Sequence, residues 1–79
     1  MEVNHLAPGE HGPENCDRLR LGVDDDGKFD AMGIRLNGNV TAHSILPGKY
    51  DTEDEALAVG LAWAEENNIQ VLHVERPNA

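Results

Sequence analysis

The fold is decided by the stretch from Thr52 to Asn68, which reads TEDEALAVGLAWAEENN. Thr52 and Glu55 have the T-x-x-E spacing of a capping box, in which side chains satisfy the free N–H groups at a helix start. Acidic residues fill the first turn, where the helix dipole favours negative charge. Apolar or small side chains then recur with the helical period. They share one broad face, formed by Ala56, Leu57, Gly60, Leu61, Trp63 and Ala64.

Gly60 and the pair Asn67-Asn68 indicate how the helix packs and where it ends. A glycine inside a helix costs about 1 kcal/mol relative to alanine, so Gly60 indicates that the helix lies close on a sheet. Asn67 and Asn68 follow the periodic stretch, and asparagine tolerates the left-handed conformation in which many helices end. We therefore expect a sheet-packed helix that ends at this pair.

Three strand patterns precede the helix. The residues from Arg18 to Asp24, RLRLGVD, alternate polar and apolar as a half-buried strand does. The turn DDG at 25–27 leads into a second strand from Lys28 to Leu36, and a third runs from Val40 to Leu46. These strands predict an antiparallel meander in front of the helix.

The connection Asn37-Gly38-Asn39 is a strong hairpin signal. Its length can be argued from side-chain faces, because a shift of one residue moves every side chain to the other face. A three-residue loop with a bulge gathers the large apolar residues on one face, and we therefore expect that loop. The residues it would bring together are Met32, Ile34, Leu36, Val40, Ala42 and Leu46.

The region 69–75 is rich in β-branched and apolar residues and predicts a last strand. The expected order is therefore β-β-β-α-β, an α+β two-layer sandwich with one helix covering an antiparallel meander. Residues 1–17 contain Pro and Gly at four positions and show no strand or helix period, so we expect a flexible tail. The domain would then span 18–76, followed by a C-terminal tail at 77–79.

Composition limits the function. The 79 residues include 15 acidic and six basic side chains, a net charge of −9, and only 39% are apolar. Such a short chain has little room for a deep catalytic cleft, so we expect a non-enzymatic protein without a cofactor. No apolar run is long enough to span a membrane, and the N-terminus does not resemble a signal peptide. A single cysteine fits a reducing compartment, which predicts a cytoplasmic location.

The acidic balance opposes direct binding to nucleic acid or to anionic membranes, because both are polyanions. It favours fast association with a basic protein. We therefore predict that carboxylates form the partner-binding surface. The candidates lie in the first predicted turn and at the two ends of the helix: Asp24, Asp25, Asp26, Glu53, Asp54, Glu55, Glu65 and Glu66.

A secondary candidate is a basic stripe on the sheet face away from the helix, which could hold a phosphate or an acidic loop of a partner. Strand alternation predicts that this face carries Arg18, Arg20, Arg35, Thr41 and His43. These cations could equally pair with aspartates of the same chain.

Two further functions remain open. The first is a small metal-binding protein that uses His5, His11 and Cys16, with His43 or His73 as a fourth ligand, although the spacing is not that of known zinc motifs. The second is a structural domain that forms a homodimer. Its contacts would be the small apolar residues Ala58, Val59 and Ala62 on the back of the helix, or an edge strand.

The segment LPGKYDTEDEAL, from Leu46 to Leu57, resembles HicB-type antitoxins, which have a Leu-Pro-Gly step followed by a Thr-x-x-Glu-Ala helix start. The resemblance implies a partial RNase H-like fold that binds a small basic ribonuclease toxin and blocks it. In size and charge the chain is also similar in type to phage anti-CRISPR inhibitors. The sequence thus predicts an inhibitor that covers the basic, nucleic-acid-binding surface of a partner protein.

Overall fold

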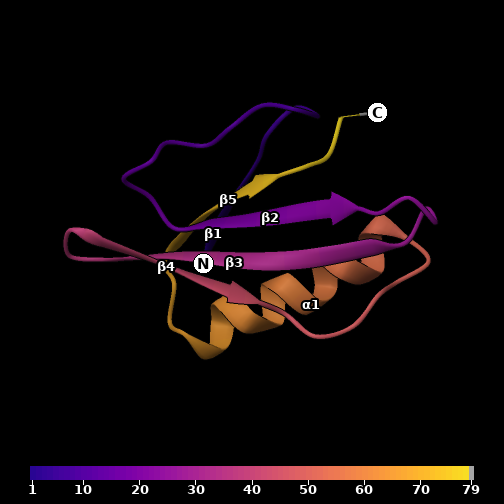
Figure 1. Cartoon of the computed structure of the whole chain (residues 1–79). Helices are drawn as coiled ribbons and strands as arrows, with labels where there is room; N and C mark the ends of the chain where they lie inside the picture. Colours follow the sequence, from indigo (N-terminus) through magenta and orange to yellow (C-terminus); the bar gives the residue numbers. More distant parts are fainter. Residues whose placement is uncertain (79) are drawn as a thin grey trace.

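The computed structural model describes residues 1–78, which form one five-stranded sheet covered on one face by a helix (Figure 1). The order of the strands across the sheet is β1-β5-β2-β3-β4. The α+β two-layer architecture expected from the sequence is confirmed. The elements are β1 (Glu2–His5), β2 (Arg18–Val23), β3 (Phe29–Asn37), β4 (Val40–Ile45), α1 (Glu53–Glu66) and β5 (Val71–Glu75).

The sheet combines two kinds of strand pairing. The strands β2, β3 and β4 form the expected antiparallel meander. After α1 has crossed the sheet, β5 enters beside β2 and runs parallel to it. The outer strand β1 then pairs in parallel with the free side of β5. Long-range pairing of the last strand therefore closes the domain.

Residues 1–17 do not form the separate tail that the sequence suggested. Glu2–His5 forms β1, with Val3 aligned to Leu72. The segment 6–17 then passes over the sheet face opposite α1 (Figure 1), where the Gly12 backbone is buried against Arg18 and His73. The expectation of a segment without regular structure, outside the domain, is wrong for β1.

Both ends of α1 match the sequence. The Thr52 hydroxyl accepts a hydrogen bond from the Glu55 backbone N–H at 3.2 Å and donates one to the Glu55 carboxylate at 3.0 Å. These contacts join the two residues of the predicted capping box, and the Glu55 carboxylate accepts from the Thr52 hydroxyl in place of the Thr52 backbone N–H. The C-cap is Asn67, and Asn68 has a φ of 55°, in the left-handed region. The predicted stop signal is therefore confirmed.

The helix lies close to the sheet because its inner face carries small residues. Ala56, Gly60 and Ala64 are buried against the sheet. A Cβ atom at Gly60 would meet the fully buried side chain of Leu19 on β2. The close approach inferred from Gly60 is confirmed, and it sets the distance between the two layers.

The β3–β4 connection differs from the prediction. Asn37 is aligned with Val40, so the loop has two residues, Gly38 and Asn39, and no bulge. Gly38 has a φ of 65°, which suits such a tight hairpin. The prediction of a three-residue loop assumes that the large apolar side chains of the two strands share one face. That assumption is wrong, because Met32, Ile34 and Leu36 are aligned with Ile45, His43 and Thr41.

At the centre of β3 the helix side carries two small residues instead, Ala31 and Gly33. The Trp63 indole lies directly over Gly33, where a Cβ atom would collide with it. Strand alternation then places Met32, Ile34 and Leu36 on the opposite side of the sheet, which we call the open face. Ile34 is nevertheless fully buried there, between its cross-strand neighbours Arg18 and His43.

Candidate functional site

One end of the molecule gathers most of the predicted acidic residues. The loop before α1 is tied to the start of β3 by two backbone hydrogen bonds between Phe29 and Tyr50, of 2.7 and 2.8 Å. The β2–β3 turn and the start of α1 therefore lie at the same end (Figure 1, right). Eight carboxylates lie here and form what we call the acidic pole: Asp24, Asp25, Asp26, Asp30, Asp51, Glu53, Asp54 and Glu55.

Three cations lie among these eight carboxylates, which leaves a local net charge of −5. Each cation pairs with carboxylates of the acidic pole itself, and Arg76 also lies 3.2 Å from the His5 ring in β1. The pairs are Lys28 with Asp51, Lys49 with Asp30 (2.8 Å) and Asp24 (3.4 Å), and Arg76 with Glu53 (3.4 Å).

Hydrogen bonds favour the charged forms of Asp24, Lys28 and Lys49. The Asp24 carboxylate accepts hydrogen bonds from the backbone N–H groups of Lys28 and Asp26, and the Lys28 bond in particular lowers the pKa of Asp24. The hydrogen bond to Asp51 raises the pKa of Lys28, and the bond to Asp30 raises the pKa of Lys49. The ion pairs therefore hold the β2–β3 turn against the loop before α1.

Four carboxylates of the acidic pole face solvent without a cation. In residues 1–78, no Lys, Arg or His side chain forms an ion pair with Asp25, Asp26, Asp54 or Glu55. All four residues are exposed. They are the groups that a positively charged surface could reach without first breaking an internal ion pair.

The structure does not bring the last two acidic candidates to this end. Glu65 and Glu66 lie in the last turn of α1, about 15 Å along the helix axis from Glu55 at 1.5 Å per residue. The predicted partner-binding set is thus split, with six of its members at the acidic pole and two at the opposite end of the helix.

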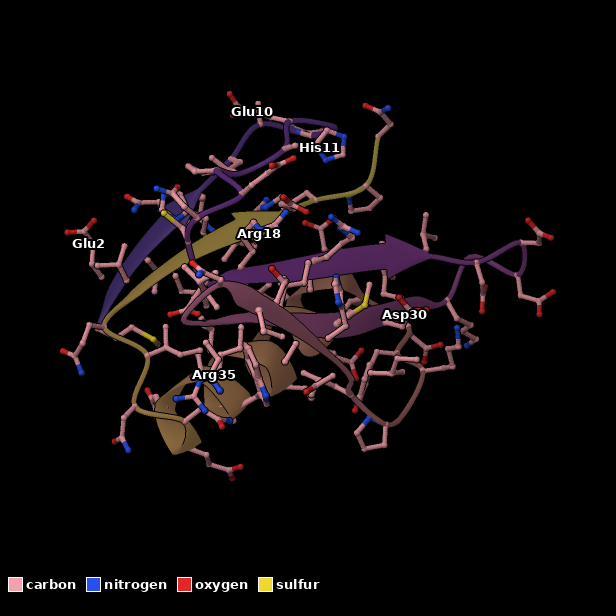
Figure 2. The ribbon with its side chains drawn as sticks, turned by 60° about the vertical axis from the view of Figure 1, so that its left-hand side comes forward. Glu2, Glu10, His11, Arg18, Asp30 and Arg35 are labelled. Atoms are coloured by element: carbon pink, nitrogen blue, oxygen red, sulfur yellow. The ribbon has the colours of Figure 1, made fainter. Side chains whose placement is uncertain are left out.

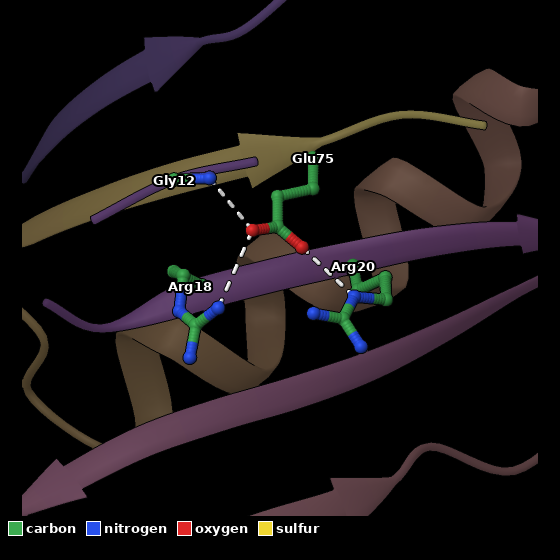
Figure 3. A network of polar contacts seen from close by, with 4 residues as sticks. All are labelled: Gly12, Arg18, Arg20 and Glu75. Atoms are coloured by element: carbon green, nitrogen blue, oxygen red, sulfur yellow. Dashed lines mark hydrogen bonds and ion pairs between the residues drawn. The ribbon is translucent and has the colours of Figure 1, made fainter. Parts of the chain in front are cut away.

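Two members of the predicted basic stripe, Arg18 and Arg20, pair with Glu75, which the sequence did not single out. Figure 3 shows the Glu75 carboxylate between Arg20 Nε at 2.8 Å and Arg18 at 3.4 Å, with the Gly12 N–H donating at 2.7 Å. Glu75 is only 3% exposed and Arg18 only 9%. Burial by itself would raise the pKa of Glu75. The hydrogen bonds from Arg20 and Gly12 and the two arginine charges outweigh it and hold the pKa below its usual range.

Arg35 does not belong to that stripe. It shares the helix side of β3 with Gly33 and donates a hydrogen bond to the Asn67 side chain at 3.1 Å. Figure 2 shows Arg35 beside the helix and Arg18 on the other side of the sheet. The expectation that Arg35 lies on the face away from the helix is wrong, whereas Thr41 and His43 do alternate onto the open face.

The candidate metal ligands do not form a group in residues 1–78. His5, in β1, has its Nδ1 atom 3.2 Å from an Arg76 guanidinium nitrogen, whereas Cys16 lies near Asn15 at the far end of the segment 6–17. In the described part of the chain, no three His, Cys, Asp or Glu residues are grouped closely enough to hold a metal ion.

The back of α1 carries the residues that a helix-mediated dimer would use. Ala58 and Ala62 are exposed there, and Val59 is half-buried. The same helix is too short for a bilayer: among residues 1–78, no helix is long and apolar enough to cross a membrane.

Comparison with known proteins returned no relative. No family model matches the chain, and neither a curated protein nor a solved structure is significantly similar to it. What the protein does must therefore be argued from the arrangement of its own residues.

Proposed function

We propose that the protein is a non-enzymatic inhibitor that binds a basic, nucleic-acid-binding protein through the acidic pole. The observation that carries this proposal is the local net charge of −5 at one end of a 79-residue chain. Carboxylates held at that end would occupy the cationic surface on which the partner otherwise binds phosphates. Nucleic acid would then be excluded by competition for the same surface.

The contact would be made chiefly by the four unpaired carboxylates. Asp25 and Asp26 lie at the tip of the β2–β3 turn, and Asp54 and Glu55 lie in the first turn of α1. Because the internal ion pairs already hold these two segments side by side, little ordering is needed when a partner binds, and this supports affinity. An antitoxin-like or anti-CRISPR-like inhibitor of a nuclease or nucleic-acid-binding complex would work in this way.

The proposal predicts that binding depends on where the charge lies and not only on its amount. One variant removes the four unpaired charges of the acidic pole by Asp25→Asn, Asp26→Asn, Asp54→Asn and Glu55→Gln. A matched control removes four charges elsewhere by Glu2→Gln, Glu14→Gln, Glu65→Gln and Glu66→Gln. Both variants carry a net charge of −5 in place of −9. Immobilised wild-type protein is loaded with cell lysate at low salt, and each soluble form is tested as a competitor for the retained proteins.

We expect the control to compete almost as well as wild type, and the pole variant to need about tenfold or more protein for the same elution. Retention should also weaken as salt rises, because exposed charges are screened. Equal competition by the two variants, or retention that is indifferent to salt, would rule out the acidic pole as the contact surface.

A further inference from the structure

The strand β4 forms one edge of the sheet and is unusually accessible. Its only neighbour in the sheet of residues 1–78 is β3, and all six of its residues are exposed. Ile45 is 86% exposed and Val40 is 66% exposed. Large apolar side chains therefore stand in solvent on a strand whose outer edge is free.

The backbone of this edge is ready for pairing. The Leu46 N–H donates to the Ala31 carbonyl of β3. In an antiparallel ladder the direction of the N–H and C=O groups alternates from residue to residue. The N–H and C=O groups of Thr41, His43 and Ile45 therefore point away from β3. A row of such groups is a template on which another strand can pair.

Nothing on β4 protects it against such pairing. Exposed edges usually carry charges, proline or a bulge, and these discourage contact with other strands. The sequence from Leu36 to Gly48 is instead the longest stretch of the chain without Asp, Glu, Lys or Arg. The register of β4 with β3 is regular, without a bulge. The chain therefore keeps its charge away from this edge, although it carries −9 overall.

The geometry points to a second copy of this chain as the occupant of the edge, paired through β4 in antiparallel orientation about a two-fold axis. Charge favours this occupant. A basic partner would find no carboxylate on β4 to pair with. Two acidic copies of this chain can approach each other there, because the edge itself carries no negative charge. Charge also favours the orientation. The Ile45 end of β4 leads to the acidic pole, so antiparallel pairing puts the two acidic poles at opposite ends of the joined sheet.

Side-chain faces restrict the register of this pairing. Residues directly opposite each other in an antiparallel pair share one face of the sheet. The register that uses every outward-facing residue places His43 opposite His43 of the second copy and Thr41 opposite Ile45 of the second copy. The two five-stranded sheets would join into one, and Ile45 would become partly covered.

Sedimentation equilibrium over a range of protein concentrations tests this dimer. Wild type is expected to associate reversibly to a dimer. Ile45→Lys places a charge on the edge, and Thr41→Pro removes an outward N–H without touching the ladder to β3. Each should weaken self-association by about tenfold or more. Far-UV circular dichroism and thermal melts confirm that the variants are folded, and neither substitution alters the acidic pole.

Ala58→Lys is the matched control, because it adds the same charge to the exposed back of α1. It should leave the association constant unchanged. A wild-type protein that is monomeric at every concentration would overturn the proposal. A dimer that Ala58→Lys disrupts and Ile45→Lys leaves intact would also overturn it, because the contact would then lie on the helix.

Cross-linking tests the register. In a Cys16→Ser background, His43→Cys should form an intermolecular disulfide under mild oxidation, since opposed residues of a ladder have Cα atoms about 5.5 Å apart. Val71→Cys, at the one exposed position of β5, should not. Equal cross-linking of the two variants, or none through position 43, would contradict pairing about His43.

Discussion

Replacing Glu75 with alanine is expected to lower the free energy of unfolding by about 3–5 kcal/mol. The substitution leaves the Arg18 guanidinium without its carboxylate, and Arg18 is only 9% exposed. It also removes the acceptor of the Gly12 N–H, which holds the segment 6–17 on the sheet. Urea denaturation followed by circular dichroism measures the loss. A decrease of less than about 1 kcal/mol would mean that this ion-pair network contributes little.

Glu75→Gln provides a milder form of the same test, because it keeps the shape and removes the charge. The lowered pKa of Glu75 means that the folded state binds fewer protons than the unfolded state near the ordinary glutamate pKa of about 4.3. The stability that Glu75 contributes is therefore present above that pH and lost as the pH falls. Wild type should lose more stability than Glu75→Gln on acidification. The control Glu66→Gln, at an exposed position, should match wild type within about 0.5 kcal/mol.

The substitution Gly60→Val is expected to have the second-largest effect, a loss of about 2–3 kcal/mol. The new side chain would enter the space filled by Leu19, which is fully buried and cannot move into solvent. Helix propensity alone predicts the opposite sign, because glycine is a poorer helix former than valine. Thermal and urea unfolding of the variant therefore separate packing from propensity.

Ala58→Val is the matched control on the exposed side of the same helix. Only propensity acts there, and the expected loss is about 0.6 kcal/mol. If Gly60→Val were as stable as wild type, the close contact between α1 and β2 would not explain the glycine.

The elements that could be predicted are those whose signals are local. The N-cap at Thr52 and the left-handed stop at Asn68 are side-chain and backbone effects within one turn of the helix, and both are present. The alternation in β2 and the turn at Gly27, with a φ of 78°, are equally local. These signals do not depend on what the rest of the chain does.

The strand β1 could not be found because nothing in its own sequence requires it. Glu2–His5 has four residues, too few for a clear alternation, and its pairing is parallel to a strand almost seventy residues away. The segment becomes a strand because it pairs with the free edge of β5. A strand of this kind depends on tertiary contacts and leaves little trace in local sequence.

The face of β3 is misassigned when side-chain size is taken as the guide to the core. Met32 and Ile34 are the large side chains, yet Trp63 reaches across from α1 and needs the space at Gly33. When a large residue on the helix meets the sheet, small residues must lie opposite it. Trp63 and Gly33 together are the signal in the sequence, and they point to the opposite assignment.

The candidate site was partly visible in the sequence. The carboxylates at 24–26 and 53–55 could be recognised as candidates, and four of the six are exposed. Their proximity depends on the bridge between Phe29 and Tyr50. Glu75 had a weaker signal: an acidic residue at the end of an apolar strand. Once β5 is known to lie beside β2, its partner Arg20 follows from the register.

The most direct test of the proposed inhibitor is competition with nucleic acid. A protein retained from lysate is purified, and its binding to a fluorescently labelled DNA or RNA oligonucleotide is followed by anisotropy while the inhibitor is added. We predict that the oligonucleotide is displaced as the inhibitor binds, and that the variant neutralised at positions 25, 26, 54 and 55 displaces it far less. A partner that holds inhibitor and oligonucleotide at the same time would contradict the account.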